Sequence, residues 1–129
     1  MLRIIILISL VLCFGQNPPP FDGQRAMDLL ITQCEFGPRF PGSNGHTQMK
    51  MFMENFLLPL ADSLYIMDEK ISHPYERRYI TLTNYLARYN LDAAYRIMLM
   101  AHWDTREFAD QDLNPENRFL PILGANDGA

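Results

Sequence analysis

Apolar residues recur at helical spacing in two stretches of the N-terminal half. The first stretch covers residues 24–34, and Asp22 stands before it in the position of an N-cap. Its apolar positions are Met27, Leu30, Ile31 and Cys34. The second stretch covers residues 45–58, where Ser43 or Asn44 could serve as the cap. The pattern predicts two amphipathic helices joined by a loop rich in turn residues.

After these helices the periodicity changes to that of extended strands. Residues 63–71 have the composition of a strand, and residues 78–87 alternate apolar side chains with threonines and an asparagine. Residues 95–101 form a continuous apolar run, which is the pattern of a strand buried on both faces. A polar loop, residues 105–118, and a second short apolar run, residues 119–123, follow. The order of these elements predicts an α/β domain.

The beginning of the chain has the pattern of a targeting segment. Arg3 precedes an apolar stretch that is too short to span a bilayer easily and that ends at a small residue. We therefore expect residues 1–15 to be a secretory signal peptide, with a membrane anchor or a lipid attached at Cys13 as the alternatives. A proline-rich spacer, residues 16–22, would follow. The protein is then expected to be exported, periplasmic or secreted, without a stable membrane span after cleavage.

Composition excludes some classes of protein. The chain has 129 residues, of which 48% are hydrophobic and 20% charged, and its formal net charge is −4. It lacks the basic excess typical of nucleic-acid-binding proteins. Only Cys34 would remain after signal cleavage, so neither an internal disulfide nor a cysteine metal motif is expected. Since no predicted element covers the second face of the buried strand, residues 23–129 are interpreted as the N-terminal part of a larger, truncated domain.

Candidate metal ligands stand where the two apolar runs end. His102 and Asp104 follow the first run two positions apart, so their side chains share one side of an extended chain, and Asp127 follows the second run. Ligands bind beyond the carboxyl ends of strands in open α/β sheets. Imidazole and carboxylate groups suit Zn²⁺. The spacing permits a zinc site, but it also fits a structural histidine and an ordinary Asp-Gly turn.

Taken in order, these motifs resemble those of the M28 zinc metallopeptidase superfamily, and most of all its bacterial glutaminyl cyclase-like members. The similarity covers about residues 36–129. It includes Gly-Pro-Arg-Phe-Pro-Gly-Ser from Gly37, Ala-His-Trp-Asp-Thr-Arg from Ala101, an Asp-rich loop, and Pro-Ile-Leu-Gly-Ala-Asn-Asp-Gly-Ala from Pro121. The resemblance implies a partial three-layer α/β/α zinc-exopeptidase-like domain. This chain would supply its N-terminal helices, a β-hairpin and the first buried strands of a mixed sheet.

The resemblance also implies roles for single residues. Asp127 matches an aspartate that binds zinc, and His102 matches a histidine that binds zinc in two-metal members but lies beside the site in single-zinc cyclases. Asp104 matches the supporting catalytic aspartate, and Trp103 could line the substrate pocket or pack in the core. One or two zinc ions are implied. The family's remaining ligands and its catalytic glutamate have no counterpart in this chain, so the chain alone is expected to bind metal poorly and to be inactive.

For the full-length protein, the resemblance implies a zinc-dependent glutaminyl-peptide cyclotransferase that forms pyroglutamate at peptide or protein N-termini and releases ammonia. An M28 aminopeptidase and a non-catalytic exported binding domain are the alternatives. Nucleic acid is not an expected partner. Outside the motifs, Arg39 is expected to be solvated or to pair with a carboxylate of the Asp-rich loop, and His46 and His73 are expected at the surface.

Overall fold

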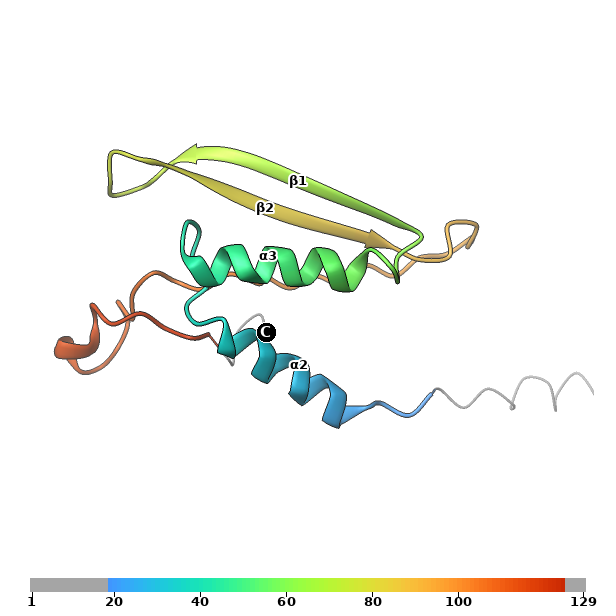
Figure 1. Cartoon of the computed structure of the whole chain (residues 1–129), viewed down its shortest axis with the longest axis horizontal. Helices are drawn as coiled ribbons and strands as arrows, with labels where there is room; N and C mark the ends of the chain where they lie inside the picture. The colour runs from blue at the N-terminus through green and yellow to red at the C-terminus, as the bar shows by residue number, and fades with distance from the viewer. Residues whose placement is uncertain (1–18, 125–129) are drawn as a thin grey trace, which may run out of the picture.

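The computed structural model describes residues 19–124, in which two α-helices precede one β-hairpin. The elements are α2 (Gly23–Glu35), α3 (Asn44–Leu57), β1 (Ser63–Ser72), β2 (Tyr79–Arg88) and a short 3₁₀ turn, η1 (Pro115–Asn117). Figure 1 shows α3 lying between the hairpin and α2. The predicted signal peptide, the first part of the spacer and Asp127 lie outside the described residues.

Both helices begin at the caps that the sequence predicts. The side chain of Asp22 accepts a hydrogen bond from the backbone N–H of Arg25 at 3.0 Å, and Ser43 accepts one from the backbone N–H of His46 at 3.0 Å. These bonds satisfy amide groups that the first turn of a helix leaves without an intrahelical partner. The two predicted helices are confirmed to within one residue at each end.

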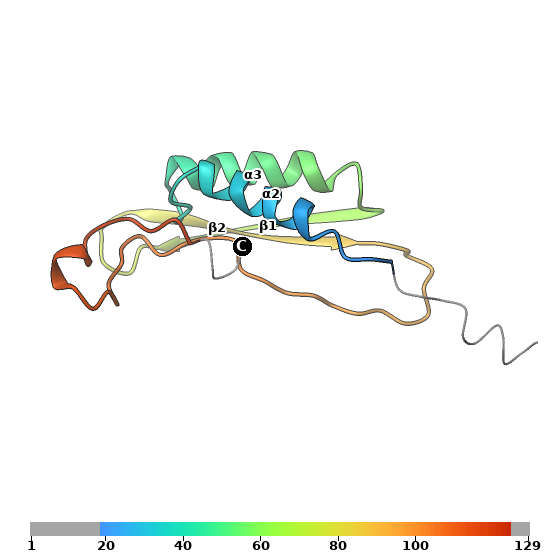
Figure 2. The same ribbon diagram turned by 90° about the horizontal axis from the view of Figure 1, so that it is seen from below.

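The predicted hairpin is also confirmed. Strands β1 and β2 pair antiparallel, with Ser63 opposite Arg88 and Ser72 opposite Tyr79. One face of the hairpin is covered by α3 (Figure 2). Alternation in β2 accounts for this arrangement, because alternate side chains of a strand point to opposite faces of the sheet.

Polar side chains tie α3 to the hairpin. Lys50 Nζ lies 3.1 Å from Asp68 Oδ1, and Tyr85 donates a hydrogen bond to Glu54 at 3.0 Å. Among residues 19–124, Met49 is the one hydrophobic side chain that is fully buried, at 3% exposure. The apolar core of the described part is therefore small, and specific polar contacts help to hold α3 against the hairpin.

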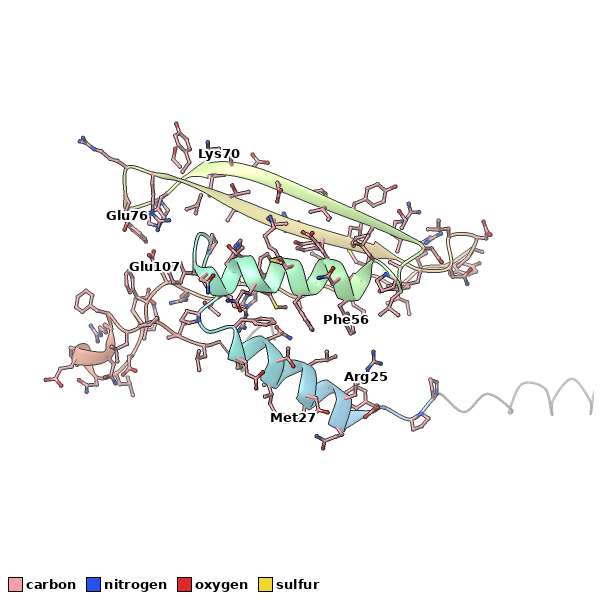
Figure 3. The ribbon with its side chains drawn as sticks, viewed as in Figure 1. Arg25, Met27, Phe56, Lys70, Glu76 and Glu107 are labelled. Carbon is pink, nitrogen blue, oxygen red and sulfur yellow. The ribbon has the colours of Figure 1, made fainter. Side chains whose placement is uncertain are left out.

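The apolar stripe of α2 is less buried than its spacing predicts. Met27 and Ile31 are about half exposed, and Cys34 is half-buried. Figure 3 shows Arg25 of α2 beside Phe56 of α3, where the guanidinium carbon lies 5.9 Å from the ring centre. The prediction of a core-facing stripe is therefore met only in part. No helix within residues 19–124 combines the length and the apolar character needed to cross a bilayer.

After β2 the chain turns and runs back along the hairpin as an extended segment, which Figures 1 and 2 both show. The predicted buried strand at residues 95–101 is not observed in the described part of the chain. No strand forms there, and the side chains of Tyr95 and Leu99 are 94% and 91% exposed. A strand needs a neighbour that accepts its backbone hydrogen bonds. The apolar run has the composition of a buried strand, but residues 19–124 supply no such neighbour.

The α/β class itself is confirmed, because two helices are combined with an antiparallel hairpin in the described residues. What the sequence pattern could not indicate is which elements meet within the described residues. The return of the chain after β2 is the feature that matters for function. It carries residues 102–105 past the start of α3, where the candidate site lies.

Candidate functional site

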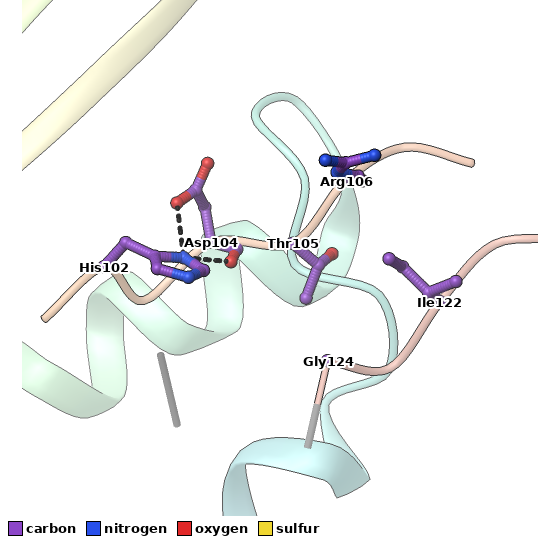
Figure 4. Close-up of a pocket in the computed structure, with 6 residues that line it drawn as sticks. All are labelled: His102, Asp104, Thr105, Arg106, Ile122 and Gly124. Atoms are coloured by element: carbon purple, nitrogen blue, oxygen red, sulfur yellow. Dashed lines mark hydrogen bonds and ion pairs between the residues drawn. The ribbon is translucent and has the colours of Figure 1, made fainter. Parts of the chain in front are cut away.

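His102 and Asp104 are in contact at the edge where the sequence places the candidate site. His102 Nδ1 lies 3.0 Å from the backbone oxygen of Asp104 and 3.4 Å from its Oδ1 (Figure 4). A carbonyl oxygen can only accept a hydrogen bond, so Nδ1 carries the proton in this contact. The neutral ring therefore has its lone pair on Nε2. A backbone carbonyl or a carboxylate commonly orients a metal-binding histidine in this way.

The ends of the two apolar runs meet at one hollow of about 410 Å³. Its lining residues are His102, Asp104, Thr105, Arg106, Ile122 and Gly124 (Figure 4). The side chains of His102 and Asp104 are 49% and 44% exposed, so both reach solvent from the rim. The hollow thus joins two segments that are distant in the sequence, and the first of them carries the predicted site residues His102 and Asp104.

The donors at this edge suit zinc in kind but not in number. Within residues 19–124, no three His, Cys, Asp or Glu side chains lie close enough together to hold a metal ion. His102 and Asp104 offer one nitrogen and one carboxylate donor, whereas a protein zinc site has at least three protein ligands. Asp127, the ligand implied by the resemblance, lies outside the described residues. The roles of these residues therefore stay predictions.

Arg39 joins the two segments from the inside. It is 0% exposed, and its guanidinium donates to four backbone carbonyl oxygens at 2.9 to 3.2 Å. These oxygens belong to Gln33, Trp103, Leu123 and Gly124. Both expectations for Arg39 were wrong, because it is neither solvated nor bound to a carboxylate of the Asp-rich loop. Nothing in the local sequence signals carbonyl partners more than sixty residues away.

The loop that carries Arg39 is pressed against the start of α3. Ser43 caps the helix and also donates its hydroxyl to the backbone oxygen of Pro38 at 2.8 Å. A Cβ atom on Gly45 would lie 2.4 Å from that same Pro38 oxygen, so only glycine fits at this point of the helix. The loop, and with it Arg39, is therefore held in a fixed position relative to α3.

Trp103 packs inward from the same edge. Its ring stacks on His46 with 4.5 Å between centres and meets Tyr85 edge-on, and its Nε1 donates to the backbone oxygen of Thr83 at 3.1 Å. These contacts give Trp103 a packing role, and its predicted part in substrate binding stays a prediction. His46 is 6% exposed, so its expected surface position was wrong. Burial, with a smaller effect of the Lys50 charge, holds the pKa of His46 below its ordinary value of 6.5.

A second cluster links the hairpin turn to the loop after the site. His73 Nε2 lies 3.3 Å from one oxygen of Glu107, and Arg78 lies 3.4 Å from the other. Figure 3 shows Glu107 close to Glu76 of the turn. The His73 side chain is only 8% exposed, which again contradicts a surface position. Its burial depends on a residue more than thirty positions away, which no local pattern reveals.

The backbone of this chain is similar to parts of several solved structures. Glutaminyl cyclase from Fimbriiglobus ruber matches with a TM-score of 0.79 and 26% identity, over 88% of this chain and 38% of that one. Bacteroides thetaiotaomicron glutaminyl cyclase bound to N-acetylhistamine matches with a TM-score of 0.78 and 33% identity, over 87% of this chain and 38% of that one. A Zn-dependent exopeptidase from Parabacteroides distasonis matches with a TM-score of 0.76 and 26% identity, over 85% of this chain and 37% of that one. No family model and no curated protein matched the chain.

The chain thus spans little more than a third of the length of each of these structures. Within that span, most of the chain shares their backbone arrangement. The resemblance inferred from the motifs is therefore confirmed. The chain is similar to the bacterial glutaminyl cyclases and has the fold of part of their domain.

Proposed function

We propose that the whole protein is a zinc-dependent glutaminyl-peptide cyclotransferase, where the whole protein means the natural polypeptide that contains this chain. The observation that carries the proposal is the hollow at which residues 102–105 and 122–124 meet. It supports a site at that edge, in a backbone similar to those of several glutaminyl cyclases. The likeness alone does not fix the reaction, because an exopeptidase shares it.

The reaction closes a ring on the substrate itself. The α-amine of an N-terminal glutamine attacks the carbon of its own side-chain amide, the amide C–N bond breaks, and ammonia leaves with the proton that the amine gives up. Bound zinc would supply Lewis-acid polarisation of the amide carbonyl. A hollow that keeps the amine and the carbonyl together supplies much of the remaining rate enhancement.

This chain's own residues contribute orientation at the edge of that site. Asp104 holds His102 with Nε2 as the acceptor nitrogen. Asp127 would be a ligand from this part of the protein, whereas His102 would be a ligand in a two-metal site and would lie beside the ion in a single-zinc cyclase. The proton shuttle is not assigned to any residue here. The ligands still needed for a complete zinc site would come from elsewhere in the whole protein.

An M28 aminopeptidase is the second candidate. The Zn-dependent exopeptidase among the similar structures favours it. His102, which matches a zinc-binding histidine of two-metal members, is compatible with it. A peptidase would release the first residue as a free amino acid, whereas a cyclase would keep it as pyroglutamate.

The test uses the whole protein with a peptide that begins with glutamine and, in parallel, an aminoacyl-arylamide. We expect mass spectrometry to show loss of one ammonia from the peptide, matched by ammonia in solution, and no arylamine. Release of free amino acids without pyroglutamate would refute the cyclase. No turnover of either substrate by zinc-loaded protein would favour the non-catalytic binding domain.

Metal analysis separates the two enzymes further. His102→Ala should leave a single-zinc cyclase with its ion but should remove one of two ions from a two-metal peptidase. Asp92→Asn is the control, because Asp92 is an exposed acidic residue in the turn after β2. The control should leave the zinc content unchanged.

Export is part of the proposal. If residues 1–15 are a signal peptide, the protein recovered outside the cytoplasm should begin at Gln16, as N-terminal sequencing would show. Recovery of an intact N-terminus in the membrane fraction would instead indicate an uncleaved anchor.

A further inference from the structure

Arg39 is not among the residues that line the hollow, yet it is fully buried beside both segments that form the site. We propose that Arg39 is a positioning residue that clamps residues 123–124 onto residues 103–105. The clamp would fix the position of the chain that leads to Asp127 relative to the segment that carries His102 and Asp104. Its effect on zinc rests on the proposed function, whereas the clamp itself does not.

The geometry of the guanidinium suits this role. Arg39 Nε donates to Trp103 O at 3.2 Å, Nη1 to Leu123 O at 2.9 Å, and Nη2 to Gly124 O at 3.1 Å. The group is planar, and its N–H bonds point in fixed directions. One rigid group therefore sets the position of Leu123 and Gly124 relative to Trp103. The acceptors are uncharged carbonyls, so the contact fixes geometry and does not neutralise an acid.

Arg39 is itself held by the edge that it positions. Its backbone N–H donates to Thr105 Oγ1 at 2.9 Å, and the backbone N–H of Thr105 donates to Arg39 O at 3.4 Å. Thr105 is 7% exposed, so these bonds are shielded from water. Buried hydrogen bonds whose partners are all satisfied rigidify the region that they connect.

Gly124 fits closely against this clamp. Its φ is +62°, a conformation that side chains disfavour. A Cβ atom there would lie 2.5 Å from Thr105 Cγ2 and 3.7 Å from Arg39 Nη2. Glycine is thus required twice, by the backbone conformation and by the close approach to Thr105.

The clamp also limits where the predicted ligand Asp127 can lie, because Asp127 is close to Gly124 in the sequence. Asp127 follows Gly124 by three residues, so its Cα can lie at most about 11 Å from that of Gly124. Gly124 lines the same hollow as His102 and Asp104 (Figure 4). Holding Gly124 therefore confines Asp127 to the neighbourhood of the other two residues. Without the clamp, the long loop between the segments would set this distance only loosely.

Arg39→Lys in the whole protein tests the proposal. Lysine keeps the positive charge but lacks the planar guanidinium that donates to four carbonyl oxygens. We expect backbone hydrogen exchange after Ile122 to become at least about tenfold faster, and the Kd for Zn²⁺, from competition with a chromophoric chelator, to rise by about tenfold or more. Exchange in β1 and β2 should not change.

Arg118→Lys is the matched control. Arg118 is an exposed arginine whose Nε donates to the backbone oxygen of Asp112 at 2.9 Å, outside the hollow. Its replacement should leave both readouts unchanged.

A second pair of variants keeps the test decisive if Arg39→Lys unfolds, which faster exchange in β1 and β2 would reveal. Gly124→Ala should weaken zinc binding and speed exchange after Ile122. Adding Thr105→Ser should partly restore both, because serine keeps the hydroxyl that binds the Arg39 amide and removes the methyl group that alanine would meet. A merely destabilising pair of substitutions would not show this rescue.

The outcomes separate the clamp from the function. Exchange and zinc affinity within twofold of wild type in Arg39→Lys would overturn the clamp. Faster exchange with unchanged zinc affinity would overturn its positioning role. Faster exchange in a protein whose wild type binds no zinc would support the clamp and refute the proposed function.

Discussion

Residues 95–101 and residues 102–105 are neighbouring parts of one extended segment, but their surroundings are opposite. The first part is apolar and exposed, with Leu99 at 91%. The second part is more polar, yet Thr105 is buried and Trp103 is packed between His46 and Tyr85. The difference is one of available partners. Polar residues with specific partners are fixed within the described chain, whereas apolar residues without a neighbouring strand are not.

The largest expected effect comes from removing the guanidinium that fixes the second part. Arg39→Leu leaves buried carbonyls without donors, which should lower the free energy of unfolding of the whole protein by about 3 kcal/mol. Urea unfolding followed by circular dichroism measures the change. Arg118→Leu is the exposed control and should cost less than about 0.5 kcal/mol. Equal midpoints for the two variants would contradict the account.

Removing the two helix caps should have smaller effects on stability, and these effects should differ between the buried start of α3 and the exposed start of α2. Ser43→Ala removes the cap of α3 and also the donor to Pro38, so it should cost about 1 to 2 kcal/mol. Asp22→Ala removes one exposed cap bond on α2 and should cost about 0.5 kcal/mol. The same unfolding measurement ranks them, and the reverse order would mean that α2 is better fixed than the structure indicates.

The pH dependence of stability should report the burial of His46. Because burial lowers its pKa below 6.5, the unfolded chain binds more protons than the folded one as the pH falls past that value. The stability contributed by neutral His46 is therefore complete above pH 6.5 and is lost as the pH falls toward the lower, folded pKa. His46→Phe keeps a stacked ring and should flatten the stability profile below pH 6.5.

The carboxyl group of Asp68 titrates at lower pH than His46. The hydrogen bond from Thr83, with help from Lys50, lowers the pKa of Asp68 below its usual 3.8. Its contribution to stability should be lost only at more acidic pH, in wild type and in His46→Phe alike. An unchanged slope near pH 6 in His46→Phe would show that another group is responsible.

The smallest effect is expected in the exposed part of the segment. Leu99→Lys in the 129-residue chain should change the free energy of unfolding by less than about 0.5 kcal/mol, because the leucine is already in contact with water. In the whole protein, a loss of about 2 kcal/mol would indicate that further chain covers this residue. A large loss in the 129-residue chain would contradict the exposure described here.

Local features of the fold were predictable, and long-range ones were not. Asp22 and Ser43 cap helices through bonds to residues three positions later, and β1 and β2 pair across a short turn, so a sequence window holds the needed information. The burial of Arg39 depends on carbonyls far along the chain. Its own neighbours, prolines and glycines, indicate only an irregular loop.

The candidate site divides in the same way. The motifs indicated His102 and Asp104 correctly as neighbours, because two residues of one extended segment share a side. They gave no sign that Arg39 joins that segment to residues 123–124. The strand predicted at residues 95–101 failed for a related reason, since composition cannot supply the partner that a strand requires.

Hydrogen exchange across residues 95–105 of the wild-type chain tests this contrast most directly. The account predicts that the amide of Thr105, which is buried and bonded to Arg39, exchanges at least about a hundredfold more slowly than the amides of residues 96–101. Uniform exchange along the whole segment, fast or slow, would contradict it.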